Sequence, residues 1–446
     1  MLEPADRYDG YEAYQYLEKG VDYRAFAYAA QVGRVPPYAG LSLSEAQAER
    51  ARRLLRDEIV ISLHEHVQVF PEDMQNLREH IRQGREPTAY EGLARSGLTA
   101  VFDNGMDGTC CISSDAGWKY DDVLFDLGVR MADMAHQDYV IKAESIGDIR
   151  YAHETGRLAH IFALEAATMI ENEVDRLDVL YGFGVRQMGI AYSEANTLGS
   201  GLKERGDGGL TYFGERAVAR MNKLGIAIDI SHSGDQTCLD VIRVSDRPVF
   251  ITHAGARGLW NSNRMKTDET IIACAERGGV IGIEAAPHTT LSPSHPRHSL
   301  ESVMDHFSYC VDLVGLEHVS FGPDTLFGDH VGLHRAFMAQ LSIAQVHGPS
   351  EIDQVPYVDG VENPAEAMAT LISWFVTHDY SDDEIRAVVG GNTLRVLEEV
   401  WDKGDDCDPP WPGRSSLPPS RSPPAPHRHL RRPRHRRRRA RRARTP

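Results

Sequence analysis

Side chains that bind metals and move protons recur at the ends of apolar runs in this sequence. The first run, EIVISLHEHVQVF (residues 58–70), carries His64 and His66. On a β-strand, residues two apart share a face, so both imidazoles point one way and Glu65 points toward the helix layer or solvent. Imidazole and carboxylate groups are ligands that suit zinc and related divalent ions. A lone histidine at a strand end is usually structural, so the other runs decide between the two interpretations.

Seven later apolar runs follow the same plan. The eight runs cover residues 58–66, 98–103, 160–165, 186–192, 225–232, 248–253, 279–285 and 318–324. Six of the later runs end in or near a polar side chain, namely Glu165, Tyr192, His232, His253, Glu284 and Asp324. Because the carboxyl ends of parallel strands meet at one face, we expect these side chains to converge. The pattern predicts a metal site made of His64, His66, Glu165, His232 and His253.

The elements that must position these side chains alternate along the chain. Amphipathic helical stretches such as YDDVLFDLGVRMADMAHQ and GERAVARMNKLG separate the apolar runs. Eight buried strands separated by helices predict a closed parallel (β/α)8 TIM barrel of the metal-dependent hydrolase type. A doubly wound open sheet is the competing fold, but the Gly-rich phosphate loop that it usually carries after an early strand is absent from the sequence.

Composition divides the chain into three parts. Residues 1–56 are predicted to form an N-terminal leader and a helix packed on the barrel, and residues 57–403 the barrel, with an insertion at about 327–360. Residues 404–446 are predicted to be a disordered Pro/Arg-rich tail, since residues 409–446 hold 13 Arg and no acidic residue. A nucleic-acid-binding arm is the alternative interpretation of this tail.

Charge, hydropathy and cysteine usage restrict location and partners. The net charge is −17 despite the basic tail, so the body is strongly acidic and should repel nucleic acid and anionic membranes. No apolar run of 18 residues and no signal peptide are found, which predicts a chain without a membrane span. Six scattered cysteines without a CxxC motif favour a reduced, cytoplasmic setting.

The sequence also resembles the renal (membrane) dipeptidase family of zinc metallopeptidases, from about Ala48 to Trp401. The resemblance rests on GDGGLTYFGERAVARMNKLGIAIDISHSGDQTCLDVI, RPVFITHAGARGLWNSNRMKTDETI, AERGGVIGI, FGPD and GGNTLRVLEEV. It implies an amidohydrolase-like barrel that hydrolyses the peptide bond of dipeptides, with two zinc ions per chain that share a bridging hydroxide. Related barrels often pair, so a homodimer is a further expectation.

The resemblance also implies roles for individual residues. His64 would bind the first metal, Glu165 would bridge both, and His232 and His253 would bind the second. Arg264 would hold the substrate's free carboxylate, and Asp324 would transfer protons at the scissile bond. Spacing alone leaves other roles open, with Arg264 as a surface arginine, Asp324 as a loop cap and Tyr192 as a packed aromatic.

Departures from the family pattern keep other functions open. His66 replaces an aspartate ligand, Ala166, Ala167 and Thr168 replace Gly-Gly-His, and Tyr192 replaces a substrate-polarising histidine whose hydrogen bond it can still donate. These changes favour, as an alternative, an amidohydrolase acting on a non-peptide amide, a cyclic amide or a lactone. A non-catalytic barrel is the third hypothesis. His288, His330 and His334 lie near the predicted barrel mouth, where they could touch substrate.

Overall fold

A computed structural model describes residues 3–105, 119–287, 289–340 and 355–401 of the chain. These residues belong to one compact unit, Met1–Asp402. The predicted tail, residues 404–446, lies outside the described part, as do Cys110, Cys111 and His288.

The core of this unit is a parallel sheet that returns to its own first strand. Its hydrogen-bonded order is β10-β1-β2-β4-β5-β6-β7-β8-β9. The strands are β1 (Ile61–Val69), β2 (Ala100–Asn104), β4 (Leu158–Leu164), β5 (Val185–Gly189), β6 (Ala227–Asp229), β7 (Phe250–Ala254), β8 (Val280–Ile283), β9 (Val319–Phe321) and β10 (Leu326–Phe327). The two ends of this order, β9 and β10, are consecutive in the chain. Segment 319–327 therefore pairs with β8 through β9 and with β1 through β10, which gives the predicted α/β barrel.

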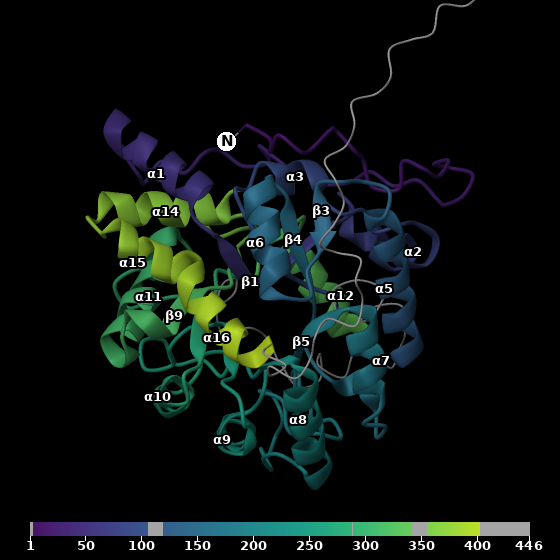
Figure 1. Cartoon of the computed structure of the whole chain (residues 1–446), viewed down its shortest axis with the longest axis vertical. Coiled ribbons are helices and arrows are strands. Elements are labelled where there is room, and N and C mark those ends of the chain that lie inside the picture. The colour runs from purple at the N-terminus through teal and green to yellow at the C-terminus, as the bar shows by residue number, and fades with distance from the viewer. Residues whose placement is uncertain (1–2, 106–118, 288, 341–354, 402–446) are drawn as a thin grey trace, which may run out of the picture. The chain divides into compact units, whose positions relative to one another are not determined.

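Helices cover the outside of the barrel. Figure 1 shows the helices that follow the strands arranged around the sheet. They are α5 (Tyr120–Met134), α6 (Ile146–Thr155), α7 (Arg176–Phe183), α8 (Tyr212–Leu224), α9 (Asp235–Val244), α10 (Asp268–Glu276) and α11 (Leu300–Val314). Every residue of the sheet path is buried, because its strands are covered on both faces, as their near-continuous apolar sequence requires.

The C-terminal helices close one end of the barrel. They are α14 (Ala367–Thr377), α15 (Asp382–Arg386) and α16 (Asn392–Trp401). Leu397 and Val400 of α16 join a buried cluster with Ile61, Phe250 and Val280, which are the first residues of β1, β7 and β8. This helix therefore fills the amino end of the barrel and leaves the carboxyl end for chemistry.

A π-helical turn, Ala387–Gly391 (η4), joins α15 to α16 and places the polypeptide against the barrel. A Cβ atom added at Gly390 would lie 2.0 Å from the carbonyl oxygen of Ile59. Only glycine allows this approach, which explains Gly390, the first residue of the sequence GGNTLRVLEEV.

The N-terminal region lies against the barrel mainly as irregular chain. Ser44 and Gln47 form a reciprocal capping box that starts α1 (Glu45–Asp57). Upstream, the Tyr11 hydroxyl donates to Asp133 of α5 at 2.8 Å, and the Tyr14 amide donates to the same carboxylate at 2.7 Å. Short helices α2 (Leu77–Gln83) and α3 (Tyr90–Ala94) follow β1.

Three local features differ from the sequence-based expectation. A short extra strand, β3 (Val140–Lys142), pairs with β4 outside the main path. β1 continues to Val69, so His64 and His66 lie inside a strand rather than at its end. Part of the predicted insertion forms α12 (His330–Gln340), while residues 341–354 lie outside the described part.

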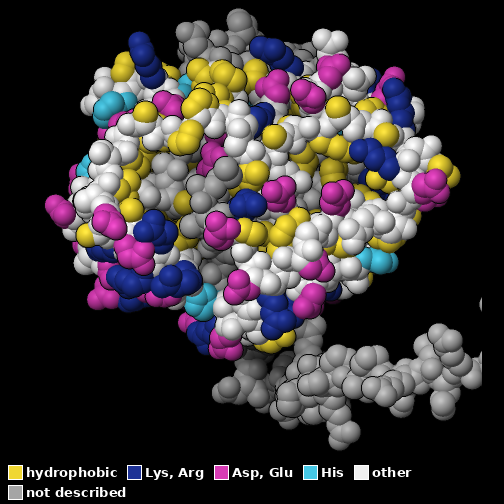
Figure 2. Space-filling model, turned by 90° about the horizontal axis from the view of Figure 1, so that it is seen from above, with side chains coloured by type: hydrophobic (Ala, Val, Ile, Leu, Met, Phe, Trp, Pro, Cys, Tyr) yellow, Lys and Arg dark blue, Asp and Glu magenta, His cyan; other side chains and the backbone are white. Residues whose placement is uncertain are grey.

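The described surface mixes both signs of charge. Figure 2 shows Asp and Glu side chains interspersed with Lys and Arg on the face that it displays. Within the described residues, no helix is both long and apolar enough to span a bilayer.

Candidate metal and active site

The predicted site residues meet at the carboxyl end of the barrel. His64 and His66 come from β1, His253 comes from β7, and Glu165 directly follows β4. His232 and Asp324 each lie three residues beyond a strand, after β6 and β9. All six side chains are buried. The barrel thus brings together groups that are up to 260 residues apart in the sequence.

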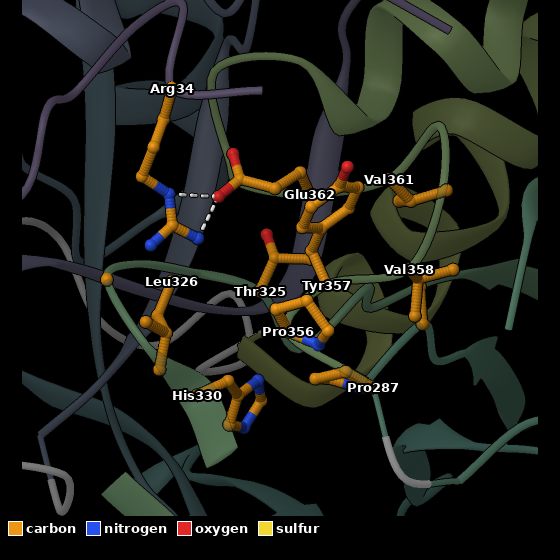
Figure 3. A pocket seen from close by; sticks show the side chains of 12 residues that line it. Arg34, Pro287, Thr325, Leu326, His330, Pro356, Tyr357, Val358, Val361 and Glu362 are labelled. Carbon is orange, nitrogen blue, oxygen red and sulfur yellow. Dashed lines mark hydrogen bonds and ion pairs between the residues drawn. The ribbon is translucent and has the colours of Figure 1, made fainter. Parts of the chain in front are cut away.

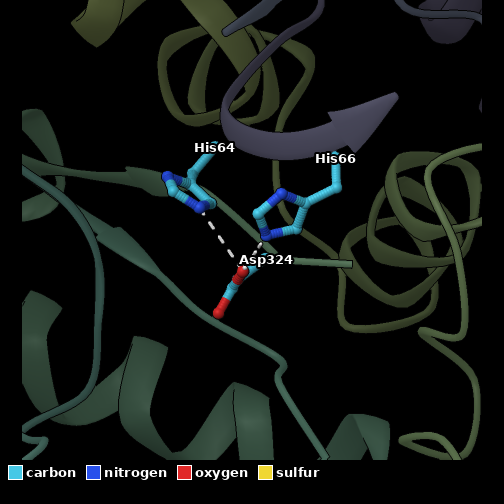
Figure 4. A group of neighbouring side chains, drawn as sticks. All are labelled: His64, His66 and Asp324. Carbon is cyan, nitrogen blue, oxygen red and sulfur yellow. Dashed lines mark hydrogen bonds and ion pairs between the residues drawn. The ribbon is translucent and has the colours of Figure 1, made fainter. Parts of the chain in front are cut away.

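One half of the site consists of His64, His66 and Asp324 (Figure 4). Asp324 Oδ1 lies 3.0 Å from His66 Nε2 and 3.4 Å from His64 Nε2. The aspartate has a positive φ of 58°, and its amide donates to the His64 carbonyl oxygen at 3.1 Å. This unusual backbone conformation interrupts segment 319–327 between β9 and β10 and directs the carboxylate toward both imidazoles.

The other half of the site is built around Glu165. Its Oε1 atom lies 2.9 Å from His232 Nε2, 3.4 Å from His253 Nε2 and 3.9 Å from His64 Nε2. The rings of His64 and His253 stack with centroids 3.5 Å apart, so the two halves of the site are continuous. Glu165 is therefore placed to contact ions in both halves.

The donor set fits divalent metal ions. Nε2 atoms of His232 and His253 approach to 2.9 Å, and burial holds the pKa of both imidazoles well below its usual value. Neutral imidazoles offer lone pairs, and two groups of three side chains, His64 with His66 and Asp324 and His64 with Glu165 and His253, are each close enough together to hold a cation. Nitrogen and oxygen ligands of this kind suit zinc and similar ions.

The two carboxyl groups of the site have opposite pKa shifts. Burial raises the pKa of Glu165 to about 8, and the negative charge of Asp324 adds to this effect. Burial would also raise the pKa of Asp324, but hydrogen bonds to His64 and His66 outweigh it and hold the pKa well below its usual value. The protein alone thus favours the neutral acid form of Glu165 near pH 7, and a bound cation would favour its ionised form.

Glu65 does not reach solvent, which corrects one of the two predicted orientations. Its side chain is fully buried, and it accepts hydrogen bonds from the amide and the hydroxyl of Thr325 at 2.8 and 2.7 Å. Burial raises its pKa to about 8. The residue ties β1 to the segment that carries Asp324, so it supports the site from behind.

Tyr192 and Arg264, both predicted to contact substrate, border the same site. The Tyr192 ring stacks on His232 with centroids 4.1 Å apart. Arg264 Nη1 donates to the His253 carbonyl oxygen at 3.0 Å, and its Nη2 forms an ion pair with Glu284. Both residues are therefore packed against candidate metal ligands, His232 and His253, and Arg264 is not the free surface arginine that spacing allowed.

Sequence reasoning missed Asn104. This buried residue ends β2, and its Nδ2 atom lies 3.3 Å from His64 Nε2. Its position at the end of the second apolar run was the available signal, but the run was taken to stop at residue 103. His330, one of the histidines expected near the mouth, lies beside His66 with ring centroids 6.1 Å apart, and His334 lies beside His330.

A recess of about 210 Å³, partly open to solvent, lies beside His330 and Thr325 (Figure 3). Arg34 from the N-terminal region forms an ion pair with Glu362 at one side of the recess, and Pro287 and His330 lie on the opposite side. The N-terminal region thus contributes a wall near the barrel mouth.

A parallel barrel with histidine and carboxylate side chains converging at its carboxyl end has the architecture of metal-dependent hydrolases. The sequence pattern of the membrane dipeptidase family, peptidase family M19, matches residues 49–339. The chain belongs to this family.

Curated relatives include two fungal dipeptidases. Dipeptidase aclJ of Aspergillus oryzae is 28% identical over 268 residues, which cover 59% of this chain and 57% of the relative. Dipeptidase verJ of Clonostachys rogersoniana is 26% identical, and the match covers 61% of its length. The chain thus spans about three fifths of the length of both relatives. A protein from the pqqA 5′ region of Klebsiella pneumoniae is 30% identical over 266 residues, 88% of its length.

Solved structures support the fold. An amidohydrolase from Pseudomonas aeruginosa superposes with a TM-score of 0.64 at 24% identity and covers 79% of this chain and 99% of its own. The probable dipeptidase PvdM from the same species gives a TM-score of 0.62 at 18% identity, covering 81% of this chain and 100% of its own.

Proposed function

We propose that this chain hydrolyses the peptide bond of dipeptides with two zinc ions bound at the barrel mouth. The observation that carries the proposal is the convergence of His64, His66, Glu165, His232 and His253 in one buried site of a family M19 barrel. Glu165 lies within 3.9 Å of histidines from both halves, which suits a carboxylate shared by two ions. Bound zinc supplies Lewis acidity toward a carbonyl oxygen and makes water an effective nucleophile near neutral pH.

The chain's own residues would then bind and orient the substrate. The Arg264 guanidinium would hold the terminal carboxylate by charge-assisted hydrogen bonds, which places the scissile amide near Glu165. The Tyr192 hydroxyl would donate a hydrogen bond to the carbonyl oxygen as negative charge develops there. Asp324 would accept the proton of the attacking water and deliver it to the leaving amine nitrogen.

A second candidate is an amidohydrolase that cleaves a non-peptide amide, a cyclic amide or a lactone. The grouping of His64 and His66 with Asp324 favours it, because two histidines on one strand replace the expected histidine and aspartate. The ion pair between Arg264 and Glu284 also favours this second candidate, because the charge of the arginine is already partly compensated by an acidic side chain of the protein.

A substrate panel on protein of known metal content tests the proposal. Dipeptides with a free carboxylate, cyclic amides and lactones would be compared by their kcat/KM values. A His253→Ala variant purified in parallel would measure contaminating peptidases. Hydrolysis of dipeptides that is lost in this variant supports the proposal. Hydrolysis of only cyclic amides or lactones would replace it with the second candidate, and a metal-free chain inactive on every substrate would refute both.

The location and the oligomeric state of the protein are also proposed from its sequence. We infer a cytoplasmic protein from the cysteine usage, and the described cysteines Cys238, Cys274 and Cys310 are buried and unpaired. A homodimer is proposed by analogy with related barrels, and light scattering coupled to size-exclusion chromatography would test it.

A further inference from the structure

A buried ion pair lies where the substrate's terminal group is proposed to bind. Arg264 belongs to the loop between β7 and α10, and Glu284 is the first residue after β8. The guanidinium Nη2 pairs with Glu284 Oε2, and Nη1 donates to the His253 carbonyl oxygen at 3.0 Å. The Arg264 side chain is 11% exposed and that of Glu284 is fully buried. The arginine is thus held from two sides.

This pair belongs to the active site rather than to the surface. The charge of Arg264 acts on Glu165, on His232 and on His253, which are all proposed metal ligands. Burial raises the pKa of Glu284 to about 7 and the charge of Asp324 adds to this effect, while the contact with Arg264 opposes it, so Glu284 is ionised above that pH. A substrate group that contacts Arg264 therefore also experiences the negative charge of an ionised Glu284.

The pair changes what the arginine can select. An arginine without an acidic partner would attract a substrate carboxylate strongly in this water-poor setting. With Glu284 in contact, the pair is neutral as a whole, and an incoming carboxylate adds a second anion beside one cation. Attraction to Arg264 is then opposed by repulsion from Glu284, whereas a neutral amide or ester at the same place meets no such repulsion.

We propose that Glu284 is a specificity-determining residue that neutralises Arg264, so that the site accepts substrates ending in a neutral amide or ester as well as those ending in a free carboxylate. The inference rests on the proposed function, because it assumes that Arg264 faces the substrate's terminal group. It predicts that the wild type prefers a free dipeptide over its C-terminal amide by no more than about tenfold in kcat/KM.

Matched substrate pairs test this inference. The kcat/KM values of Leu-Gly and Leu-Gly amide would be measured at pH 8, where Glu284 is ionised, for the wild type, for Glu284→Gln and for Glu284→Asp. Glu276→Gln, at an exposed position of α10, is the matched control. Glu284→Gln should raise the preference for the free acid at least tenfold, mainly through a lower KM for Leu-Gly. Glu284→Asp, which keeps the charge, and Glu276→Gln should retain the wild-type preference.

An unchanged preference in Glu284→Gln, or a wild-type preference above about tenfold, would overturn the inference. If Glu284→Gln fails to fold, the wild-type protein tests the inference alone, and a preference for Leu-Gly over Leu-Gly amide above about tenfold would overturn it.

Calorimetric binding of N-acetylglycine and N-acetylglycinamide separates this inference from the proposed function, because it needs no turnover. Tenfold tighter binding of N-acetylglycine to Glu284→Gln, in a protein that cleaves no dipeptide, would keep the inference and refute the function. If the wild type cleaves dipeptides but N-acetylglycine binds equally well to the wild type and to Glu284→Gln, the proposed function stands and the inference about Glu284 is refuted.

Discussion

His232 Nε2 lies 2.9 Å from His253 Nε2, although the two residues come from different strand ends of the barrel. Both imidazoles are buried, and burial keeps their pKa values low, so both rings are neutral near pH 7. Two neutral nitrogens that converge beside the Glu165 carboxylate have the arrangement that a metal ligand set requires.

The first prediction concerns the metal content of the chain. The wild type should contain close to two zinc ions per chain, and His232→Ala or His253→Ala should lose about one, because each removes a ligand next to Glu165. Elemental analysis of protein purified without added metal measures this content. Exposed His136 provides the control, since His136→Ala should keep the wild-type content. A wild type without metal, even after reconstitution, would contradict the prediction.

The second prediction concerns the role of Asp324. Asp324→Asn should keep the metal content but lower kcat about 100-fold or more, because an amide cannot accept the proton of the attacking water. Steady-state kinetics and elemental analysis would be done on the same preparation. Full activity would exclude the proton-transfer role. Loss of metal would show instead that Asp324 is a ligand of the His64–His66 half of the site.

The sequence predicted the barrel and the position of the site because both depend on repetition. His232, His253 and Asp324 each follow a buried apolar run, and parallel strands bring such positions to one end whatever the detailed packing. Features that depend on a single distant partner could not be predicted. β1 extends past His66 because it pairs with β10, and β3 has only three residues, too few for a sequence pattern. The same holds for the contact between Arg264 and Glu284, which lie on different loops.

The third prediction concerns Asn104. Its Nδ2 atom contacts His64 Nε2, and its Oδ1 atom has no hydrogen-bond partner within the part of the chain that the structure describes. Because Nε2 is also the His64 atom nearest Glu165 and Asp324, a bound ion would displace this contact. Asn104→Ala should therefore strengthen zinc binding, by up to about tenfold, since the variant has no hydrogen bond to break. Competition with a chromophoric chelator measures the affinity. Exposed Asn172 is the matched control, and equal zinc affinity in Asn104→Ala and Asn172→Ala would contradict the assignment.

The fourth prediction concerns the ion pair that attaches the N-terminal region to the barrel mouth. Arg34 is 25% exposed, whereas its partner Glu362 is 1% exposed. Removing one partner of a buried pair leaves an uncompensated charge, so Arg34→Ala should lower the free energy of unfolding by about 2 kcal/mol, discounted for the partial exposure. Urea unfolding measures this change.

Two further variants control for the loss of a surface arginine. Arg24→Ala breaks the exposed pair with Glu79 and should cost less than about 1 kcal/mol. Adding Glu362→Gln to Arg34→Ala should recover part of the lost stability, because it removes the buried charge. Equal losses in Arg34→Ala and Arg24→Ala would show that the pair with Glu362 adds no stability.

The fifth prediction concerns stability at acidic pH. Asp103 of β2 is fully buried and contacts Arg130 of α5 at 2.9 Å and His160 of β4 at 2.7 Å. Burial would raise the pKa of Asp103, but Arg130 and His160 outweigh it and lower the pKa to about 2, from 3.8 in the unfolded chain. Because the folded-state pKa is depressed, this carboxylate stabilises the fold above pH 3.8 by about 2 kcal/mol, and the contribution disappears as the pH falls through about 2.

Comparison with Asp103→Asn isolates this contribution from other acidic groups. The difference in the free energy of unfolding between the wild type and Asp103→Asn should be constant from pH 7 to pH 5 and should shrink below pH 4, as the unfolded wild-type chain takes up the proton. Urea unfolding at half-unit steps of pH measures both proteins. Curves that stay parallel down to pH 3 would mean that Asp103 titrates alike in both states. The contacts with Arg130 and His160 would then not stabilise the charged form in solution.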